Sequence, residues 1–252
     1  MILSTLARSC GILAMSCVGL AAHADDRFYG TTSDMRTVLL FRVPDKTAQK
    51  LIPAGWEIVP ADEGVNLQLV LSENVHVQSA DGKVDDNLRS LVLVVPAKKN
   101  GSDERVAVVA GGLISRAEKA PGPYSVFVPA VTDTSRKTSA SGGGKTLVEE
   151  KWRFESEAGD TASLDFEFVR GALRETKLES KIFSAKRSDF FRVYRVEQVS
   201  EAIPAAANAD RLHKLEFRAA GPTLGSIFDG SEQLVGVVSI PWYSRKIYLP
   251  GS

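Results

Sequence analysis

The chain has 252 residues, and hydrophobic residues make up 44% of them, which is enough to fill the core of one large domain or two small ones. Lysine plus arginine number 31, and aspartate plus glutamate also number 31, so the formal net charge is zero. Without a positive excess or a basic block, the sequence argues against nucleic-acid binding and against attachment to an anionic membrane.

Residues 1–24 have the pattern of a signal peptide. Arg8 supplies a positive charge, and Gly11 to Ala22 forms an apolar run of about 12 residues, too short to span a bilayer. Ala22-His23-Ala24 then matches a cleavage site. We therefore expect cleavage near Ala24, a periplasmic or secreted protein, and a single domain over residues 25–252. In the alternative, a lipoprotein, Cys17 would carry the lipid.

Both cysteines, Cys10 and Cys17, lie in that segment. A cleaved chain would contain no cysteine, which excludes disulfides, thiolate catalysis and cysteine-ligated zinc. Beyond residue 24 no stretch approaches 18 continuous apolar residues, so no membrane-spanning helix is predicted.

The stretch from Met35 to Asn74 predicts a strand, a short helix, a turn and a second strand. Arg36 to Val43 is rich in branched apolar residues, as in strands. Pro44 and Asp45 are favourable at a helix start, which predicts a helix over Lys46 to Ile52. Alternating apolar residues after Trp56 predict further strands with one buried face.

The rest of the chain is also dominated by predicted strands. A polar, Gly/Ser-rich loop is expected over Thr132 to Lys145, and Pro241 is expected to break the last strand. The segment Leu178–Phe183 is ambiguous, Ala202–Ala209 suits a helix or a loop, and Gly221–Phe228 suits a turn with a short helix. About ten strands against two or three short helices indicate a β-rich α+β fold, a largely antiparallel sheet or barrel.

Motifs for cofactors and metals are weak. Ser139 to Thr146 ends like a phosphate-binding loop, but Ser139 stands where the first glycine is required, which favours a flexible loop. His76 and His213 lie far apart, and the aspartates of residues 81–86 do not have EF-hand spacing. We therefore predict no metal and no cofactor.

Two charged residues share strand faces with apolar ones. Glu150 lies on the same face as Val148, Trp152 and Phe154, where a carboxylate is costly unless it is paired or lines a wet cavity. In one interpretation the expected strand register is wrong or Glu150 lies at a sheet edge. In the other, Glu150 lines a cavity and its carboxyl has a raised pKa. Arg36 is either a strand-end charge that reaches water or a ligand for a carboxylate.

The segment FRVPDKTAQKLIPAGWEIVP, the later Gly221-Pro222-Thr223-Leu224 and the closing Ile240-Pro241 resemble acetoacetate decarboxylase-like proteins. The resemblance implies a β-rich cone or barrel with an internal cavity, often in oligomers. Decarboxylases of this family use a lysine Schiff base from a Lys-Lys pair after a proline, and a substrate-side arginine from the first strand, here Arg36 or Arg42.

The lysine motif does not match. Ala120-Pro121-Gly122-Pro123-Tyr124 stands at the corresponding place, and Lys119 lies just upstream. The pair Lys98-Lys99 reads as exposed, and an exposed lysine is a poor nucleophile at neutral pH. Acetoacetate decarboxylation is therefore not the predicted activity.

We expect an exported protein that binds a small organic ligand, an acid among the candidates, in a cavity lined by Arg36, Tyr124, Glu150 and Trp152. A second hypothesis is a lyase or hydrolase acting on a keto acid, with Lys119 or Glu150 as the base. A third is an envelope interaction protein without a ligand. A homo-oligomer is compatible with each of them.

Overall fold

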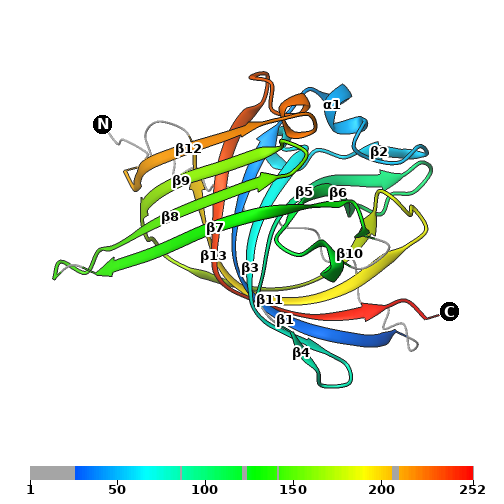
Figure 1. Ribbon diagram of the computed structural model, residues 1–252, viewed down its shortest axis with the longest axis horizontal. Coiled ribbons are helices and arrows are strands. Elements are labelled where there is room, and N and C mark those ends of the chain that lie inside the picture. Colours follow the sequence, from blue (N-terminus) through cyan, green and yellow to red (C-terminus); the bar gives the residue numbers. More distant parts are fainter. Residues whose placement is uncertain (1–25, 86, 121–123, 141, 206–209, 252) are drawn as a thin grey trace, which may run out of the picture.

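The computed structural model describes residues 26–85, 87–120, 124–140, 142–205 and 210–251. They consist mainly of β-strands (Figure 1). The strands are β1 (Arg27–Arg42), β2 (Trp56–Ile58), β3 (Leu67–Ser79), β4 (Val84–Asp85), β5 (Leu88–Lys99), β6 (Val106–Ile114), β7 (Phe127–Ala140), β8 (Thr146–Ser156), β9 (Thr161–Val169), β10 (Arg174–Ser184), β11 (Phe191–Pro204), β12 (Leu212–Ala220) and β13 (Gln233–Leu249). The helices are α1 (Asp45–Gln49) and the 3-10 helices η1 (Asp62–Gly64), η2 (Ala117–Lys119) and η4 (Leu224–Ser226). The predicted signal peptide lies outside the described residues.

Seven strands form a closed ring of hydrogen bonds. Their order is β6-β10-β11-β13-β1-β3-β5, and β5 pairs with β6 again. All neighbours in the ring are antiparallel except β6 and β10. The closing contact is short, because only residues 182–184 of β10 pair with β6.

A second, four-stranded unit leaves the ring at β6. Residues 107–109 of β6 pair with β10, whereas residues 112–114 of the same strand pair in parallel with β7. The strands β7, β8, β9 and β12 then continue antiparallel, and we call them the wing. In Figure 1 the wing crosses in front of β13, β1 and β3.

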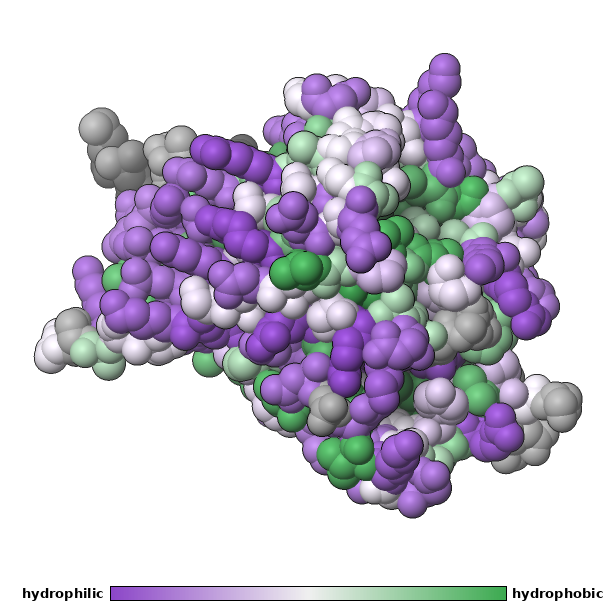
Figure 2. Space-filling view, in the orientation of Figure 1, coloured by the Kyte–Doolittle hydropathy of each residue, from purple (hydrophilic) through white to green (hydrophobic). Residues whose placement is uncertain are grey.

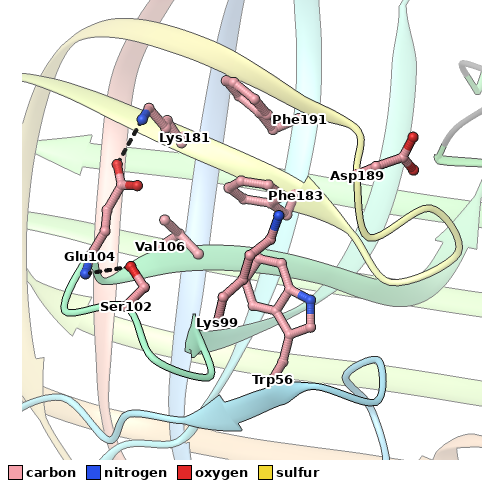
Figure 3. Close-up of a pocket in the computed structure, with 9 residues that line it drawn as sticks. All are labelled: Trp56, Lys99, Ser102, Glu104, Val106, Lys181, Phe183, Asp189 and Phe191. Atoms are coloured by element: carbon pink, nitrogen blue, oxygen red, sulfur yellow. Dashed lines mark hydrogen bonds and ion pairs between the residues drawn. The ribbon is translucent and has the colours of Figure 1, made fainter.

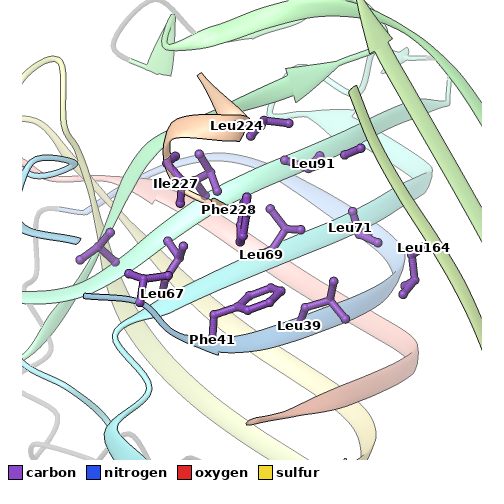
Figure 4. Close-up of a cluster of buried hydrophobic side chains, with 14 of the residues drawn as sticks. Leu39, Phe41, Leu67, Leu69, Leu71, Leu91, Leu164, Leu224, Ile227 and Phe228 are labelled. Carbon is purple, nitrogen blue, oxygen red and sulfur yellow. The ribbon is translucent and has the colours of Figure 1, made fainter. Parts of the chain in front are cut away.

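The main hydrophobic core lies between the wing and one face of the ring strands. Alternate residues of β1, including Leu39 and Phe41, point to that face and are almost completely buried. The Phe41 ring lies 5.2 Å from Phe217 of β12 and 5.0 Å from Phe228, which follows η4 (Figure 4). Each fully buried side chain of this size contributes about 1.5–3 kcal/mol, so this core is what holds the wing on the ring.

The outer surface is mainly polar over the wing. Figure 2 shows hydrophilic residues over most of this face, with hydrophobic residues exposed between the wing and the side that carries β5 and β6. No helix among the described residues is long and apolar enough to cross a membrane.

The β-rich fold with a few short helices is confirmed, and its two parallel pairings make the sheet mixed. The strand–helix–strand order of the first segment is also confirmed, although the helix is shorter and ends at Gln49. The loop expected over Thr132 to Lys145 was wrong, because β7 continues to Ala140 and pairs residue by residue with β8. Backbone hydrogen bonds to β8 hold residues 132–140 as a strand, and a polar composition does not reveal such pairing. Pro241 does not end β13 but lies at a bulge in its pairing with β1.

Candidate functional site

The four predicted ligand-binding residues fall into two groups on opposite faces of β1. Glu150 of β8 accepts a hydrogen bond from Thr37, on the face of β1 that packs against the wing, and Trp152 donates to Glu150. Arg36 points to the other face, because neighbouring strand residues alternate. Tyr124, just before β7, belongs to the second group through its contacts with β11.

Glu150 is a buried and fully paired carboxylate. Its side chain is 1% exposed and lies beside Trp152 and Phe154, as the alternation predicted. Its Oε2 accepts hydrogen bonds from Thr37 Oγ1 at 2.5 Å and from Trp152 Nε1 at 3.2 Å. Its Oε1 lies 3.0 Å from Nε of Arg136, the residue directly opposite on β7. These contacts account for the buried charge and join the wing to the ring.

The second group is larger, and we call it the Arg–Tyr cluster. Register brings its members together, since Arg245 of β13 lies opposite Thr32 of β1 and Tyr243 lies opposite Asp34. On the other side of β13, Val196 of β11 lies opposite Arg245. The cluster consists of Asp34, Arg36, Tyr124, Arg192, Tyr194, Tyr243 and Arg245.

Arg36 lies at one end of the cluster. Its Nε donates to Asp34 Oδ2 at 3.0 Å, and a second bond joins the same two side chains. Its guanidinium lies 3.5 Å from the centre of the Tyr243 ring, a close cation–π contact. The Arg36 side chain is only 13% exposed, so it is not a strand-end charge that reaches water.

Arg245 occupies the middle of the cluster. Its Nε donates to Thr32 Oγ1 at 2.9 Å, and its guanidinium lies 4.4 Å from the centre of the Tyr194 ring. Burial alone would lower the pKa of Arg245, but Tyr194, Tyr243 and Asp34 outweigh burial, and the net effect raises the pKa. Arg245 is therefore permanently charged.

Tyr124 provides a neutral phenol beside these cations. Its hydroxyl donates to the backbone oxygen of Ile182 at 2.5 Å. Burial raises the pKa of Tyr124 well above its ordinary value, Tyr194 adds to the rise, and Arg192 and Arg245 oppose it. The hydroxyl can accept a hydrogen bond from a ligand, but it does not ionise near neutral pH.

Arg192 lies at the other end of the cluster. The residue is 6% exposed, and its guanidinium lies 4.4 Å from the Tyr29 ring and 5.3 Å from the Tyr124 ring. Within the described part of the chain, Arg192 Nε and Asp34 Oδ1 are buried without a hydrogen-bond partner. The cluster thus holds three guanidinium groups against one carboxylate, and it contains an unused buried donor and an unused buried acceptor.

Lys119, the other candidate base, lies outside both groups. Its Nζ is 2.8 Å from Asp85 Oδ1, and about a third of each side chain is exposed. Among the described residues, no group of three or more His, Cys, Asp or Glu side chains is placed to hold a metal ion.

Sequence reasoning found Arg36 and Tyr124 but not the other five members of the cluster. The only signal was the alternation in FFRVYRV, which puts Arg192 and Tyr194 on one face of β11. Nothing in that pattern indicates that β13 and β1 complete the cluster.

Solved structures with this architecture identify the fold. The enduracididine biosynthesis enzyme MppR complexed with pyruvate has a TM-score of 0.52 and 13% identity, with 90% of each chain covered. An acetoacetate decarboxylase-like enzyme from Sphingomonas wittichii RW1 has a TM-score of 0.53 and 13% identity, covering 90% of this chain and 93% of that chain.

The chain has the acetoacetate decarboxylase-like fold. MppR complexed with the condensation product of pyruvate and imidazole 4-carboxaldehyde also matches, with a TM-score of 0.53, 12% identity and coverage of 90% of this chain and 89% of that one. No protein-family model and no curated protein matches the sequence. In this chain, the acetoacetate decarboxylase-like fold brings β1, β11 and β13 together and so assembles the Arg–Tyr cluster.

Proposed function

We propose that this chain is an exported protein that binds a small organic acid at the Arg–Tyr cluster of its acetoacetate decarboxylase-like fold. The observation that carries the proposal is the buried excess of guanidinium groups. Arg36, Arg192 and Arg245 share the cluster with a single carboxylate, Asp34, and Arg192 Nε has no partner among the described residues.

A bound carboxylate would satisfy this arrangement. Buried charges are normally paired, because burying an unpaired charge costs on the order of several kcal/mol. A carboxylate accepts two parallel hydrogen bonds from a guanidinium, which neither a neutral ligand nor a halide does. A hydroxyl group on the same ligand would donate to Asp34 Oδ1, which has no partner among the described residues, or to the Tyr124 oxygen.

The structural neighbours support a small acid rather than a large one. MppR has been solved with pyruvate, a three-carbon keto acid, and it shares this fold over 90% of each chain. For the present chain, pyruvate is therefore the first probe. The leader-like pattern of residues 1–24 supports export.

The lyase alternative receives less support from the contacts. Schiff-base chemistry needs a free amine with a depressed pKa. The charged nitrogens of the Arg–Tyr cluster are guanidinium groups, and residues 121–123 are Pro-Gly-Pro in the sequence. Lys119 is paired with Asp85 and partly exposed.

Native mass spectrometry tests this function. The full chain is expressed with its leader and purified from the periplasm without added carboxylates. We expect a polypeptide that begins at Asp25 and carries a small acid, which is released on denaturation. The Arg192→Gln protein, prepared in the same way, should carry less of it. A protein that arrives empty and fails to take up added pyruvate would contradict the proposal.

A further inference from the structure

A pocket of about 180 Å³ lies on the face of β11 opposite to the Arg–Tyr cluster (Figure 3). Phe191, which lines it, directly precedes Arg192 of the cluster, and neighbouring strand residues point to opposite faces. The pocket is therefore separate from the proposed organic-acid site.

Three aromatic side chains form part of the pocket wall, and charged and polar residues form most of the rest. Trp56 of β2 and Phe183 of β10 meet edge to face with ring centres 4.9 Å apart, and Phe191 lies 4.9 Å from Phe183. A closed apolar cavity of about 150 Å³ holds one benzene molecule, so this more open pocket has room for one ring. The size and the walls fit a single planar ring, which packs against aromatic side chains in offset or edge-to-face geometry.

Most of the described charged side chains around the pocket form ion pairs with each other, and the exception is the ammonium of Lys99. Lys181 lies 2.8 Å from Glu104, and Asp189 lies 3.1 Å from Arg187, so these four charges are paired. Among the described residues, the Lys99 ammonium makes no direct ion pair, and its charge acts on Asp189 only strongly enough to help Arg187 lower the pKa of that carboxyl.

Lys99 is also held in a defined place. Its ammonium lies 5.3 Å from the centre of the Trp56 ring and 5.2 Å from that of Phe183, within the range of cation–π attraction. Figure 3 shows the side chain extending over Trp56 toward Phe183. A ring that entered the pocket would therefore have an ammonium group at its edge.

We propose that this pocket is a second binding site, for a monocyclic aromatic carboxylate. The ring contacts Trp56 and Phe191, and the carboxylate accepts a charge-assisted hydrogen bond from Lys99 Nζ. Neither contact involves the Arg–Tyr cluster, so this site does not depend on the organic acid proposed there.

Benzoate is the probe, and its affinity is measured by ligand-observed NMR on the full folded chain. Lys99→Gln should weaken benzoate binding about fivefold, the upper end of the effect of an exposed ion pair. The matched control is Lys98→Gln, since Lys98 is paired with Glu57 at 3.0 Å and lies outside the pocket. That variant should change benzoate affinity less than about twofold.

A charge exchange sharpens the test. Lys99→Glu should lose benzoate and gain binding of benzylamine, which has the same ring and the opposite charge. Because Lys99 is exposed, these variants should unfold at the same temperature as the wild type. Benzoate that does not bind to the wild type, or that binds equally to Lys99→Gln and Lys98→Gln, would overturn the proposal. If Arg192→Gln leaves pyruvate binding unchanged, the organic-acid proposal fails but the benzoate proposal stands, since the two sites share no residue.

Discussion

Thr37 of β1 and Glu150 of β8 are joined by a 2.5 Å hydrogen bond, although 113 residues separate them in sequence. One residue belongs to the ring and the other to the wing, so the bond crosses the interface that the main core fills. Arg136 completes the group by pairing with Glu150 from β7. A buried polar group in the middle of an apolar interface fixes the register in which the two parts meet.

Removal of Arg136 should therefore be costly. Arg136→Gln leaves the Glu150 carboxylate buried without its cation, and we expect a loss of about 3 kcal/mol in the free energy of unfolding. The double variant Arg136→Gln with Glu150→Gln removes both charges and should recover part of that loss. Urea denaturation at neutral pH measures both effects. A double variant that is less stable than the sum of the two single changes would contradict this account.

Gly112 should be irreplaceable where β6 changes partners. Its φ of +148° disfavours other residues, and an added Cβ would lie 1.9 Å from the backbone oxygen of Leu91. Gly112→Ala should cost about 3 kcal/mol or prevent folding. The neighbouring Gly111 is the control, because its Cβ would make only a 3.6 Å contact. Equal thermal stability of Gly111→Ala and Gly112→Ala would show that the ring closes differently here.

Alkaline pH should destabilise the protein through Tyr124. Burial raises its pKa above the value of the unfolded chain, about 10, so the folded state retains a proton that the unfolded state releases. The stabilisation is fully present below pH 10 and declines as the pH rises, by up to about 1.4 kcal/mol per pH unit.

Tyr124→Phe removes that titrating group and should flatten the decline between pH 10 and 11. The comparison uses urea denaturation of both proteins at each pH. Parallel pH profiles would mean that Tyr124 ionises freely in the folded protein, and hence that it is not enclosed as the Arg–Tyr cluster requires.

Local patterns predicted much of this molecule, and the limits are physical. Alternation correctly placed Glu150 on a buried face, because side-chain direction in a strand has a period of two. Arg136 was missed because its segment is polar on both sides and its strand identity depends on pairing with β8. Arg192, Tyr243 and Arg245 were missed for a similar reason, since their proximity depends on long-range pairing of β1, β11 and β13.

The predicted roles of Arg36 and Tyr124 stay predictions, but their surroundings are now specific. Both belong to a cluster that contains three arginines and one carboxylate. Glu150 and Trp152 belong instead to the contact between ring and wing.

Calorimetric titration of pyruvate into the wild type, Arg192→Gln and Arg195→Gln tests the central claim most directly. Arg195 lies on the same strand but is paired with Glu179 at 2.7 Å, with 41% of its side chain exposed, which makes it a matched control. We predict that Arg192→Gln weakens pyruvate binding at least about tenfold, the effect of a lost charge-assisted hydrogen bond in a buried site, and that Arg195→Gln leaves it unchanged. Equal affinity in all three proteins, or no binding to the wild type, would contradict the assignment of the Arg–Tyr cluster as an organic-acid site.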